Sequence, residues 1–229
     1  MYSLYIANKN YSSWSLRPWL LMRELGIPFE ERLQVFTPGS NRAAFRRFSP
    51  AGTVPCLVDG ERVIWDSLAI TEYLAERHAG VWPADPAARA WARSAAAEMH
   101  SGFGALRGIC GMNCGLRVRL RVQSPALDQD RARVEEIWLD GLDRFAGPFL
   151  AGAAFSAVDA FFAPVAFRVQ TYDLPFGERA LAYVSRLLTL PGMVAWYEAA
   201  LAEPWREPDH EAEVGAAGEV LADLRASAD

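Results

Sequence analysis

The chain has 229 residues, of which 52% are hydrophobic and 22% are charged, and its formal net charge is −5 at pH 7. This composition indicates a globular protein with a substantial core, and it excludes a disordered chain and a basic nucleic-acid-binding surface. The three cysteines do not form a disulfide framework, and no apolar run reaches the ~18 residues of a membrane span. The N-terminus has no signal-peptide pattern, so we expect a cytoplasmic protein that contacts no membrane.

The first 80 residues alternate between strand and helix patterns. Alternating apolar residues predict strands, and apolar residues three and four apart predict helices. Asp59-Gly60 between two apolar runs predicts a hairpin turn. The expected order is strand 2–7, helix 15–25, strand 29–36, short helix 41–48, strands 53–58 and 61–65, and helix 66–80. This order predicts an α/β domain with a mixed sheet over residues 1–80.

After a linker over 81–85, where prolines interrupt the pattern, we find helical patterns only. The run Ser156-Ala157-Val158-Asp159 has the form of a capping box with Asp in place of the usual Glu or Gln. The expected helices are 87–107, 125–146, 157–174, 181–188, 193–201 and a last helix over 214–224. Residues 86–229 are therefore predicted to form an all-helical domain.

Four short motifs occur in a characteristic order along the chain. They are Ser12-Ser13-Trp14-Ser15 after the first strand, Thr53-Val54-Pro55, Asp66-Ser67 before a helix, and Ser156 to Asp159. In this order and spacing they resemble the cytosolic glutathione transferase family over nearly the whole chain. The resemblance implies a thioredoxin-like N-terminal domain with a mixed four-stranded sheet, followed by an all-α domain.

Within that family, the Ser-Ser-x-Ser-x-Arg run is most similar to zeta-type and related bacterial serine enzymes. The chain departs from the zeta pattern at Trp14, where that pattern has Cys, and at Pro18-Trp19, where it has an aliphatic run. Because Trp14 is bulky enough to reshape the pocket for the second substrate, zeta-type isomerisation is not assumed.

The resemblance implies a glutathione-binding site. A cis peptide bond before Pro55 turns the Val54 N–H and C=O toward the glutathione backbone, and Thr53 adds a hydrogen bond. Ser67, at a helix start, binds the γ-glutamyl carboxylate with help from the helix dipole. Asp66 pairs with the γ-glutamyl ammonium and also serves as the N-cap of that helix.

The hydroxyl groups near residue 12 are candidates for stabilising the glutathione thiolate. A free thiol has a pKa of ~8.5, and a hydroxyl donor at a helix N-terminus favours the ionised form. Ser12 is the first candidate donor, Ser13 the second and Ser15 the third. The alternative is that Ser12 or Ser13 only caps the helix. Tyr11 is a rival hydroxyl, whereas Tyr5 is expected to pack in the strand.

Arginines are the other charged residues of interest. Arg17 is expected to pair with Glu24 or Asp66 rather than with a ligand. Three further arginines on expected helical segments either bind an anionic second substrate or face solvent: Arg107, Arg117 and Arg168.

No metal site is expected. Cys110 and Cys114 are spaced one helical turn apart without histidine partners, so buried small hydrophobes are the better interpretation.

The sequence thus predicts a homodimeric enzyme that activates glutathione through a serine hydroxyl for attack on a small electrophile. Two alternatives stay open. One is a glutathione-dependent cis–trans isomerase or reductase of the same fold, and the other is a non-catalytic module used for dimerisation or scaffolding.

Overall fold

A computed structural model describes residues 1–227. Four strands form a sheet in the order β2-β1-β3-β4. The first strand pairs in parallel with β2 and antiparallel with β3, which pairs antiparallel with β4. The strands are β1 (Tyr2–Ile6), β2 (Phe29–Leu33), β3 (Cys56–Asp59) and β4 (Arg62–Trp65). The expected mixed sheet and the hairpin turn at Asp59-Gly60 are confirmed.

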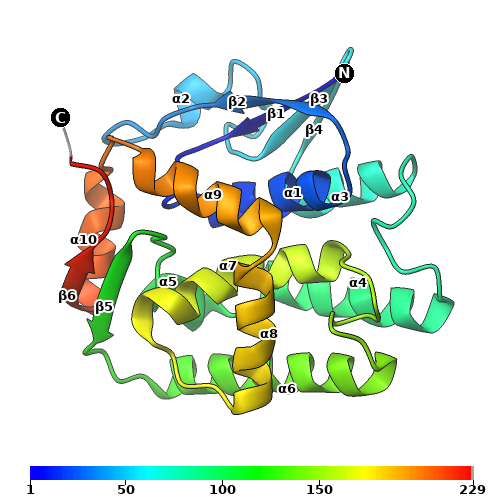
Figure 1. The fold of residues 1–229 in the computed structure, drawn as a ribbon. Helices are drawn as coiled ribbons and strands as arrows, with labels where there is room; N and C mark the ends of the chain where they lie inside the picture. Colours follow the sequence, from blue (N-terminus) through cyan, green and yellow to red (C-terminus); the bar gives the residue numbers. More distant parts are fainter. Residues whose placement is uncertain (228–229) are drawn as a thin grey trace.

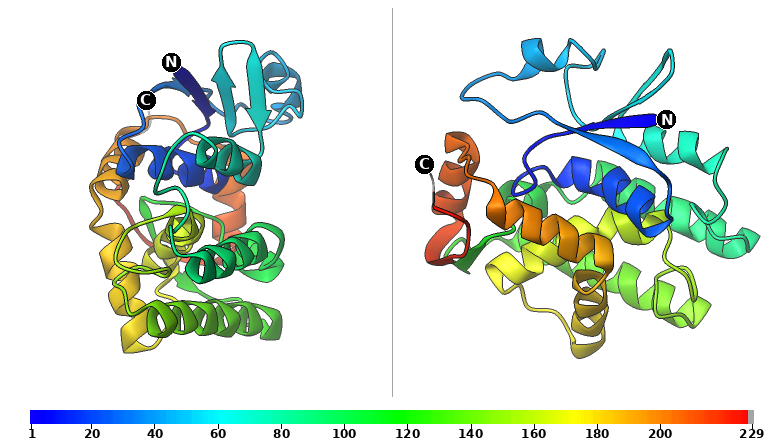
Figure 2. Two further views of the ribbon diagram at one scale, coloured as in Figure 1. Left: turned by 90° about the vertical axis from the view of Figure 1, so that its right-hand side faces the viewer. Right: turned by 45° about the horizontal axis from the view of Figure 1, so that its top comes forward.

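Helices α1 (Ser13–Glu24) and α3 (Ser67–Ala75) pack on the side of the sheet that faces the rest of the molecule, and α2 (Arg42–Phe45) lies on the other side (Figures 1 and 2). Helix α1 carries Leu16, Leu20 and Leu21 into the core. It begins two residues earlier than the apolar spacing predicts, so the serine run forms its first turn.

The second domain is a layered set of helices built around α7 (Ala157–Tyr172), which lies in its centre and contacts α1, α4 and α8 (Figure 1). Every residue of α7 except Gln170 is buried. The other helices are α4 (Pro86–Ser101), α5 (Gly104–Ile109), α6 (Pro125–Phe145), α8 (Glu178–Leu188), α9 (Pro191–Ala202) and α10 (Pro208–Ala217). The expected helical second domain is confirmed, and none of the described helices is long and apolar enough to cross a membrane.

This domain also contains a two-stranded ribbon that the sequence analysis missed. Strand β5 (Leu116–Leu120) pairs antiparallel with β6 (Gly218–Asp223) beside α10 (Figure 1). The expected helix over 214–224 is therefore wrong beyond Ala217, because pairing with β5 satisfies the backbone of β6 instead. Leu116 and Val118 are buried while the arginines between and after them are more exposed, which is the period of two that a strand requires.

The helix expected over 87–107 is interrupted after Ser101. Phe103 adopts a left-handed backbone conformation with φ of 59°, and α5 starts at the next residue. Helix α5 ends at Ile109, so Cys110 and Cys114 do not lie one turn apart on a helix as predicted. Both side chains are nonetheless fully buried and reduced, as expected for small hydrophobes.

Candidate active site

Two cavities lie on either side of Trp14, which lines both. The Pro55 cavity measures about 400 Å³ and is lined by Trp14, Ala51, Thr53, Val54, Pro55, Trp65, Asp66, Ser67 and His100. The Ser13 cavity measures about 420 Å³. It is lined by Tyr11, Ser12, Ser13, Trp14, Phe36, Asn41, Arg42, Phe45, Gly52, Thr53, Val54, Arg107, Gly111, Met112, Arg168, His210 and Glu213. Thr53 and Val54 also line both cavities, which are therefore adjacent; together we call them the elongated site.

The backbone at Val54 is available to a ligand. The Val54–Pro55 peptide bond is cis, as expected. Strand β3 starts at Cys56, and within residues 1–227 neither the N–H nor the C=O of Val54 forms a hydrogen bond. An extended peptide can therefore pair with this segment as an added strand.

At the start of α3, Asp66 uses its two carboxylate oxygens differently. Oδ1 accepts hydrogen bonds from the Leu68 N–H at 2.8 Å and the Ala69 N–H at 3.3 Å, which confirms the N-cap role. Oδ2 lies 3.2 Å from Nε2 of His100. Burial lowers the pKa of His100, against the opposing pull of Asp66, so the imidazole favours its neutral form at neutral pH. Oδ2 of Asp66 therefore faces a largely neutral imidazole at the wall of the Pro55 cavity.

Ser67 is 1% exposed, and its hydroxyl oxygen has no hydrogen-bond partner in the described part of the chain. A buried polar group without a partner is costly to the folded state. The hydroxyl borders the Pro55 cavity at the N-terminus of α3, where N–H groups and the helix dipole favour an anion.

The three serines of the first turn of α1 have different partners. Ser12 Oγ donates to Ser15 Oγ at 2.7 Å, and Ser15 Oγ also accepts the Ala7 N–H at 3.3 Å. Ser15 is fully buried and links the first strand to α1, so it is a structural residue. Ser12 precedes α1 but makes no side-chain cap hydrogen bond. The alternative that Ser12 only caps the helix is therefore wrong.

Ser13 differs from its neighbours because its hydroxyl hydrogen has no acceptor among the described residues. Its Oγ accepts a hydrogen bond from Nη2 of Arg168 at 3.5 Å, at the wall of the Ser13 cavity. The N–H groups of Trp14 and Ser15 also make no hydrogen bond within residues 1–227. At the cavity wall this turn therefore brings together the Ser13 hydroxyl, the Arg168 guanidinium and Trp14, whose N–H has no partner, an arrangement suited to an anion.

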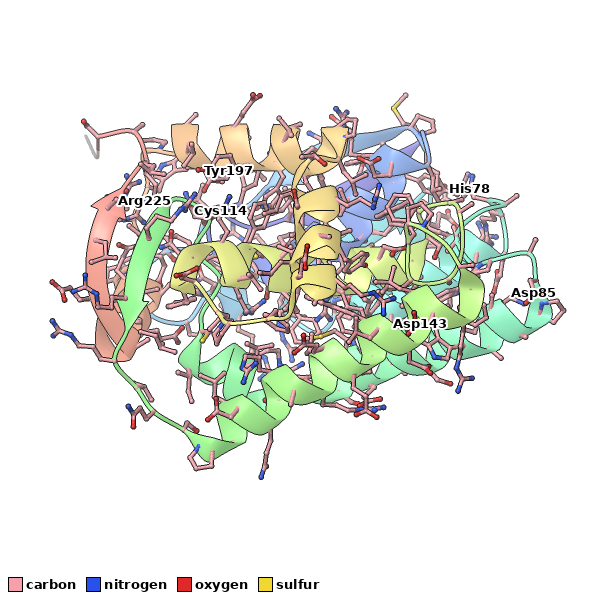
Figure 3. The ribbon with its side chains drawn as sticks, turned by 60° about the horizontal axis from the view of Figure 1, so that its bottom comes forward. His78, Asp85, Cys114, Asp143, Tyr197 and Arg225 are labelled. Carbon is pink, nitrogen blue, oxygen red and sulfur yellow. The ribbon has the colours of Figure 1, made fainter. Side chains whose placement is uncertain are left out.

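Tyr11 does not have a hydroxyl proton to offer. Its OH donates to Oε1 of Glu211 at 2.7 Å and accepts from Arg225 at 3.3 Å. Burial and the bond to Glu211 raise the pKa of Tyr11 far above its usual value. In Figure 3, Arg225 lies beside the β5–β6 ribbon, and its guanidinium also pairs with Glu211. The rival role considered for Tyr11 is not supported by this geometry, and Tyr5 stacks on Phe48 as a packing residue.

The loop before α1 is held from the second domain. The carboxylate of Glu203, which is 5% exposed, accepts the N–H of Lys9 at 2.7 Å and of Asn10 at 3.3 Å. Because both amides are fixed by a residue that follows α9, the position of the serine turn depends on the packing of the two domains.

The arginine predictions have mixed outcomes. Arg17 is 2% exposed and forms no ion pair among the described residues, so the expected pairing with Glu24 or Asp66 is wrong. Its guanidinium lies 4.1 Å from the centre of the Trp14 ring and 4.9 Å from that of Phe161, and Nε and Nη1 have no hydrogen-bond partner within residues 1–227.

Arg107 and Arg168 line the Ser13 cavity, and the guanidinium of Arg107 lies 5.2 Å from the Trp14 ring. Arg117 lies on strand β5 and donates to Cys114, Leu116 and Tyr197, away from the cavity. The candidate role in binding an anion therefore narrows to Arg107 and Arg168.

Several residues of the Ser13 cavity were not identified from the sequence, among them Phe36, Arg42, His210 and Glu213. His210 stacks on Tyr11 and on Phe36, with ring centres 5.0 and 5.3 Å apart. It comes from α10, within an acidic C-terminal stretch that carries no local sign of a binding site. The only available signal was that His210 is an isolated aromatic residue among charged ones.

Comparison with known proteins agrees with the fold. A sequence profile of the glutathione S-transferase N-terminal domain matches residues 11–77. A glutathione transferase homolog from Burkholderia, solved with bound glutathione, superposes with a TM-score of 0.64 at 23% identity over 87% of this chain and 97% of that one. The chain has the glutathione transferase fold, and its first domain belongs to the glutathione S-transferase N-terminal family.

Two curated proteins are similar to this chain in sequence. Dichloromethane dehalogenase from Methylorubrum extorquens is 43% identical over 65 residues, which is 27% of this chain and 23% of that protein. A probable maleylacetoacetate isomerase from Vibrio cholerae is 26% identical over 181 residues, covering 74% and 79% of the two chains. The dehalogenase match thus spans only about a quarter of that enzyme's length.

Proposed function

We propose that the protein is a glutathione transferase in which Ser13 donates a hydrogen bond to the glutathione thiolate, which then attacks a small electrophile. The observation that carries the proposal is the Ser13 hydroxyl, whose oxygen accepts from buried Arg168 while its hydrogen is available to the cavity. Sequence alone favoured Ser12, but that hydroxyl is committed to Ser15.

Glutathione fits the elongated site in one direction. Its γ-glutamyl end has a carboxylate for Ser67 at the start of α3 and an ammonium for Oδ2 of Asp66. Its cysteinyl backbone pairs with Val54, next to the cis bond. This pose directs the thiol past Trp14 toward Ser13, because Trp14, Thr53 and Val54 line both cavities.

The Ser13 environment favours the ionised thiol. A hydroxyl donor, the guanidinium of Arg168 and the positive end of α1 each stabilise negative charge on sulfur. Lowering the thiol pKa by two units corresponds to about 2.7 kcal/mol of preferential binding of the thiolate. In the transfer step, sulfur forms the new bond to carbon, and the electrophile's leaving group departs with its bonding electrons.

Glutathione titration tests the proposal. We expect calorimetric binding at millimolar glutathione, a rise in melting temperature, and thiolate absorbance that titrates at least about one unit below the ~8.5 of a free thiol. S-methylglutathione serves as the control, since it lacks the thiol and gives no thiolate signal. Absence of binding at millimolar glutathione favours the alternative of a non-catalytic dimerisation or scaffolding module.

Binding without a lowered thiol pKa is the outcome that contradicts serine activation while keeping a glutathione site. Isomerase and reductase activities use the same thiolate, so product analysis separates them from conjugation. We also expect a homodimer, which sedimentation measures directly.

A further inference from the structure

Arg107 and Arg168 line the Ser13 cavity, and Arg17 lies against Trp14, which forms part of its wall. Arg17, Arg107 and Arg168 surround Trp14 and Ser13, and none of the three forms an ion pair within residues 1–227. Arg17 and Arg168 are 2% and 3% exposed, and Arg107 is half-buried. Buried cations without counter-ions destabilise a fold, and a bound anion offsets that cost.

The cations also act on one another. Burial and repulsion from Arg168 and Arg107 hold the pKa of Arg17 well below its usual value, and burial lowers the pKa of Arg168 to about 10. All the same, Arg168 remains protonated at neutral pH. The acidic side chain that lines the cavity, Glu213, is exposed to solvent on α10, so water screens its charge.

Donor groups of this cluster remain unused. Arg168 uses Nε on the Cys110 carbonyl and Nη2 on Ser13, whereas its Nη1 has no partner in the described part of the chain. Arg107 uses only Nη1, which donates to the carbonyls of Met99 and His100. The fork geometry of guanidinium groups matches a planar carboxylate.

Asp66 attracts Arg17 and Asp130 attracts Arg107, but neither carboxylate lines the Ser13 cavity. A glutathione thiolate beside Ser13 supplies one negative charge to a cavity that both Arg107 and Arg168 line. Building on the proposed function, we propose that the second substrate is itself an organic anion, a small electrophile whose carboxylate binds Arg107 and Arg168 while its reactive carbon faces the sulfur. The cavity volume of about 420 Å³ accommodates a small molecule of this kind. Trp14, held over the guanidinium of Arg17, forms the apolar wall for its carbon skeleton.

The experiment compares two glutathione conjugates that differ in one group. S-(4-carboxybenzyl)glutathione carries the anion, and S-(4-carbamoylbenzyl)glutathione has a neutral amide of similar shape. Since the glutathione parts are identical, their contributions cancel in the ratio of dissociation constants measured by calorimetry. We expect the carboxylate conjugate to bind about 10- to 100-fold more tightly at low salt.

Arg107 is the more accessible of the two arginines proposed to bind the carboxylate, and its replacement tests where the preference arises. Arg107→Gln should reduce the ratio to below about 3-fold, and Arg107→Lys, which keeps the charge but not the fork, should give an intermediate ratio. Arg119→Gln is the matched control, because Arg119 lies exposed on β5 and pairs with Glu219. That variant should keep the full ratio, and melting temperatures verify that each variant is folded.

The outcomes separate this inference from the proposed function. If the unaltered protein binds glutathione but binds the two conjugates equally, or binds neither, the anionic substrate is wrong and the glutathione site stands. A ratio that survives Arg107→Gln also overturns the assignment. If glutathione itself does not bind, the proposed function fails and this inference fails with it.

Discussion

Helices α1 and α7 both begin after a serine, yet the two helix starts have opposite character. At α7, the Asp159 carboxylate accepts the N–H groups of Leu150 and Ser156, both at 3.0 Å, and the hydroxyl of Tyr183 at 2.9 Å. The capping box expected from the sequence is present there. At α1, Ser12 caps nothing, and the N–H groups of Trp14 and Ser15 have no partner within residues 1–227.

The difference shows what each helix start contributes. A helix start that is held by a capping box stabilises the fold, whereas a start that leaves donors at a cavity wall costs stability and can bind an anion. Helix α3 combines the two, because Asp66 caps it while the Ser67 hydroxyl stays unpaired. Substitutions at the three starts should therefore separate effects on folding from effects on ligand binding.

The largest effect is expected at the start of α7, where the capping box is formed. Asp159→Ala removes the acceptor of four buried donors, the N–H groups of Leu150 and Ser156 and the hydroxyls of Ser156 and Tyr183. We expect the free energy of unfolding to fall by about 3 to 5 kcal/mol in urea titrations. Glutathione affinity of the folded fraction should stay the same. Asp128→Ala, an exposed first-turn aspartate of α6, is the control and should change stability by less than about 0.5 kcal/mol. A change at Asp159 no larger than at Asp128 would show that the box does not stabilise the fold.

Substitution at the start of α1, the open start whose donors have no partner, should affect activity more than stability. Ser13→Ala should lower kcat/KM by about 100-fold and raise the pKa of the bound thiol toward ~8.5, because one donor to the thiolate is lost. Its unfolding free energy should change by less than about 1 kcal/mol. Ser15→Ala is the contrast: it removes the acceptor of the Ala7 N–H and should mainly reduce stability. If Ser12→Ala, rather than Ser13→Ala, raises the thiol pKa, the donor is Ser12.

A smaller effect is expected at the mixed start of α3. Ser67→Ala should weaken glutathione binding about 10-fold by calorimetry, since a hydroxyl bond to a carboxylate is lost. Because Ser67 Oγ has no partner in the described chain, the variant should be as stable as the parent protein or slightly more stable. Ser94→Ala, on the exposed face of α4, should change neither quantity. A marked loss of stability in Ser67→Ala would indicate an internal role for this hydroxyl.

The sequence predicted those parts of the site that depend on neighbouring residues. The hairpin at Asp59-Gly60, the cap at Asp66 and the cis bond before Pro55 are all set within a few positions, and all three are confirmed. The choice between Ser12 and Ser13 was different. It depends on Arg168, which is 155 positions from Ser13 and reaches it only through the packing of α7 on α1.

Arg17 and the β5–β6 ribbon illustrate the same limit. Spacing along the chain suggested acidic partners for Arg17, but packing placed Trp14 and Phe161 against its guanidinium instead. The residues of β6 have apolar spacing compatible with a helix, and the presence of β5 beside them decides the strand. Likewise, His210 joins the cavity only because α10 folds back over the loop before α1.

The smallest effect on chemistry is expected for Tyr11→Phe, which tests whether the open start depends on its own serine or on the neighbouring tyrosine. The Tyr11 hydroxyl donates a hydrogen bond to Glu211, so loss of this hydroxyl should shift the pKa of the bound thiol by less than about 0.3 units. Stability should fall by about 1 kcal/mol, because Glu211 loses a donor but keeps the bidentate contact with Arg225. Absorbance titration of bound glutathione and urea unfolding measure the two quantities. A thiol pKa raised by a unit or more would move the activating hydroxyl from Ser13 to Tyr11, and the start of α1 would then not supply the activating hydroxyl.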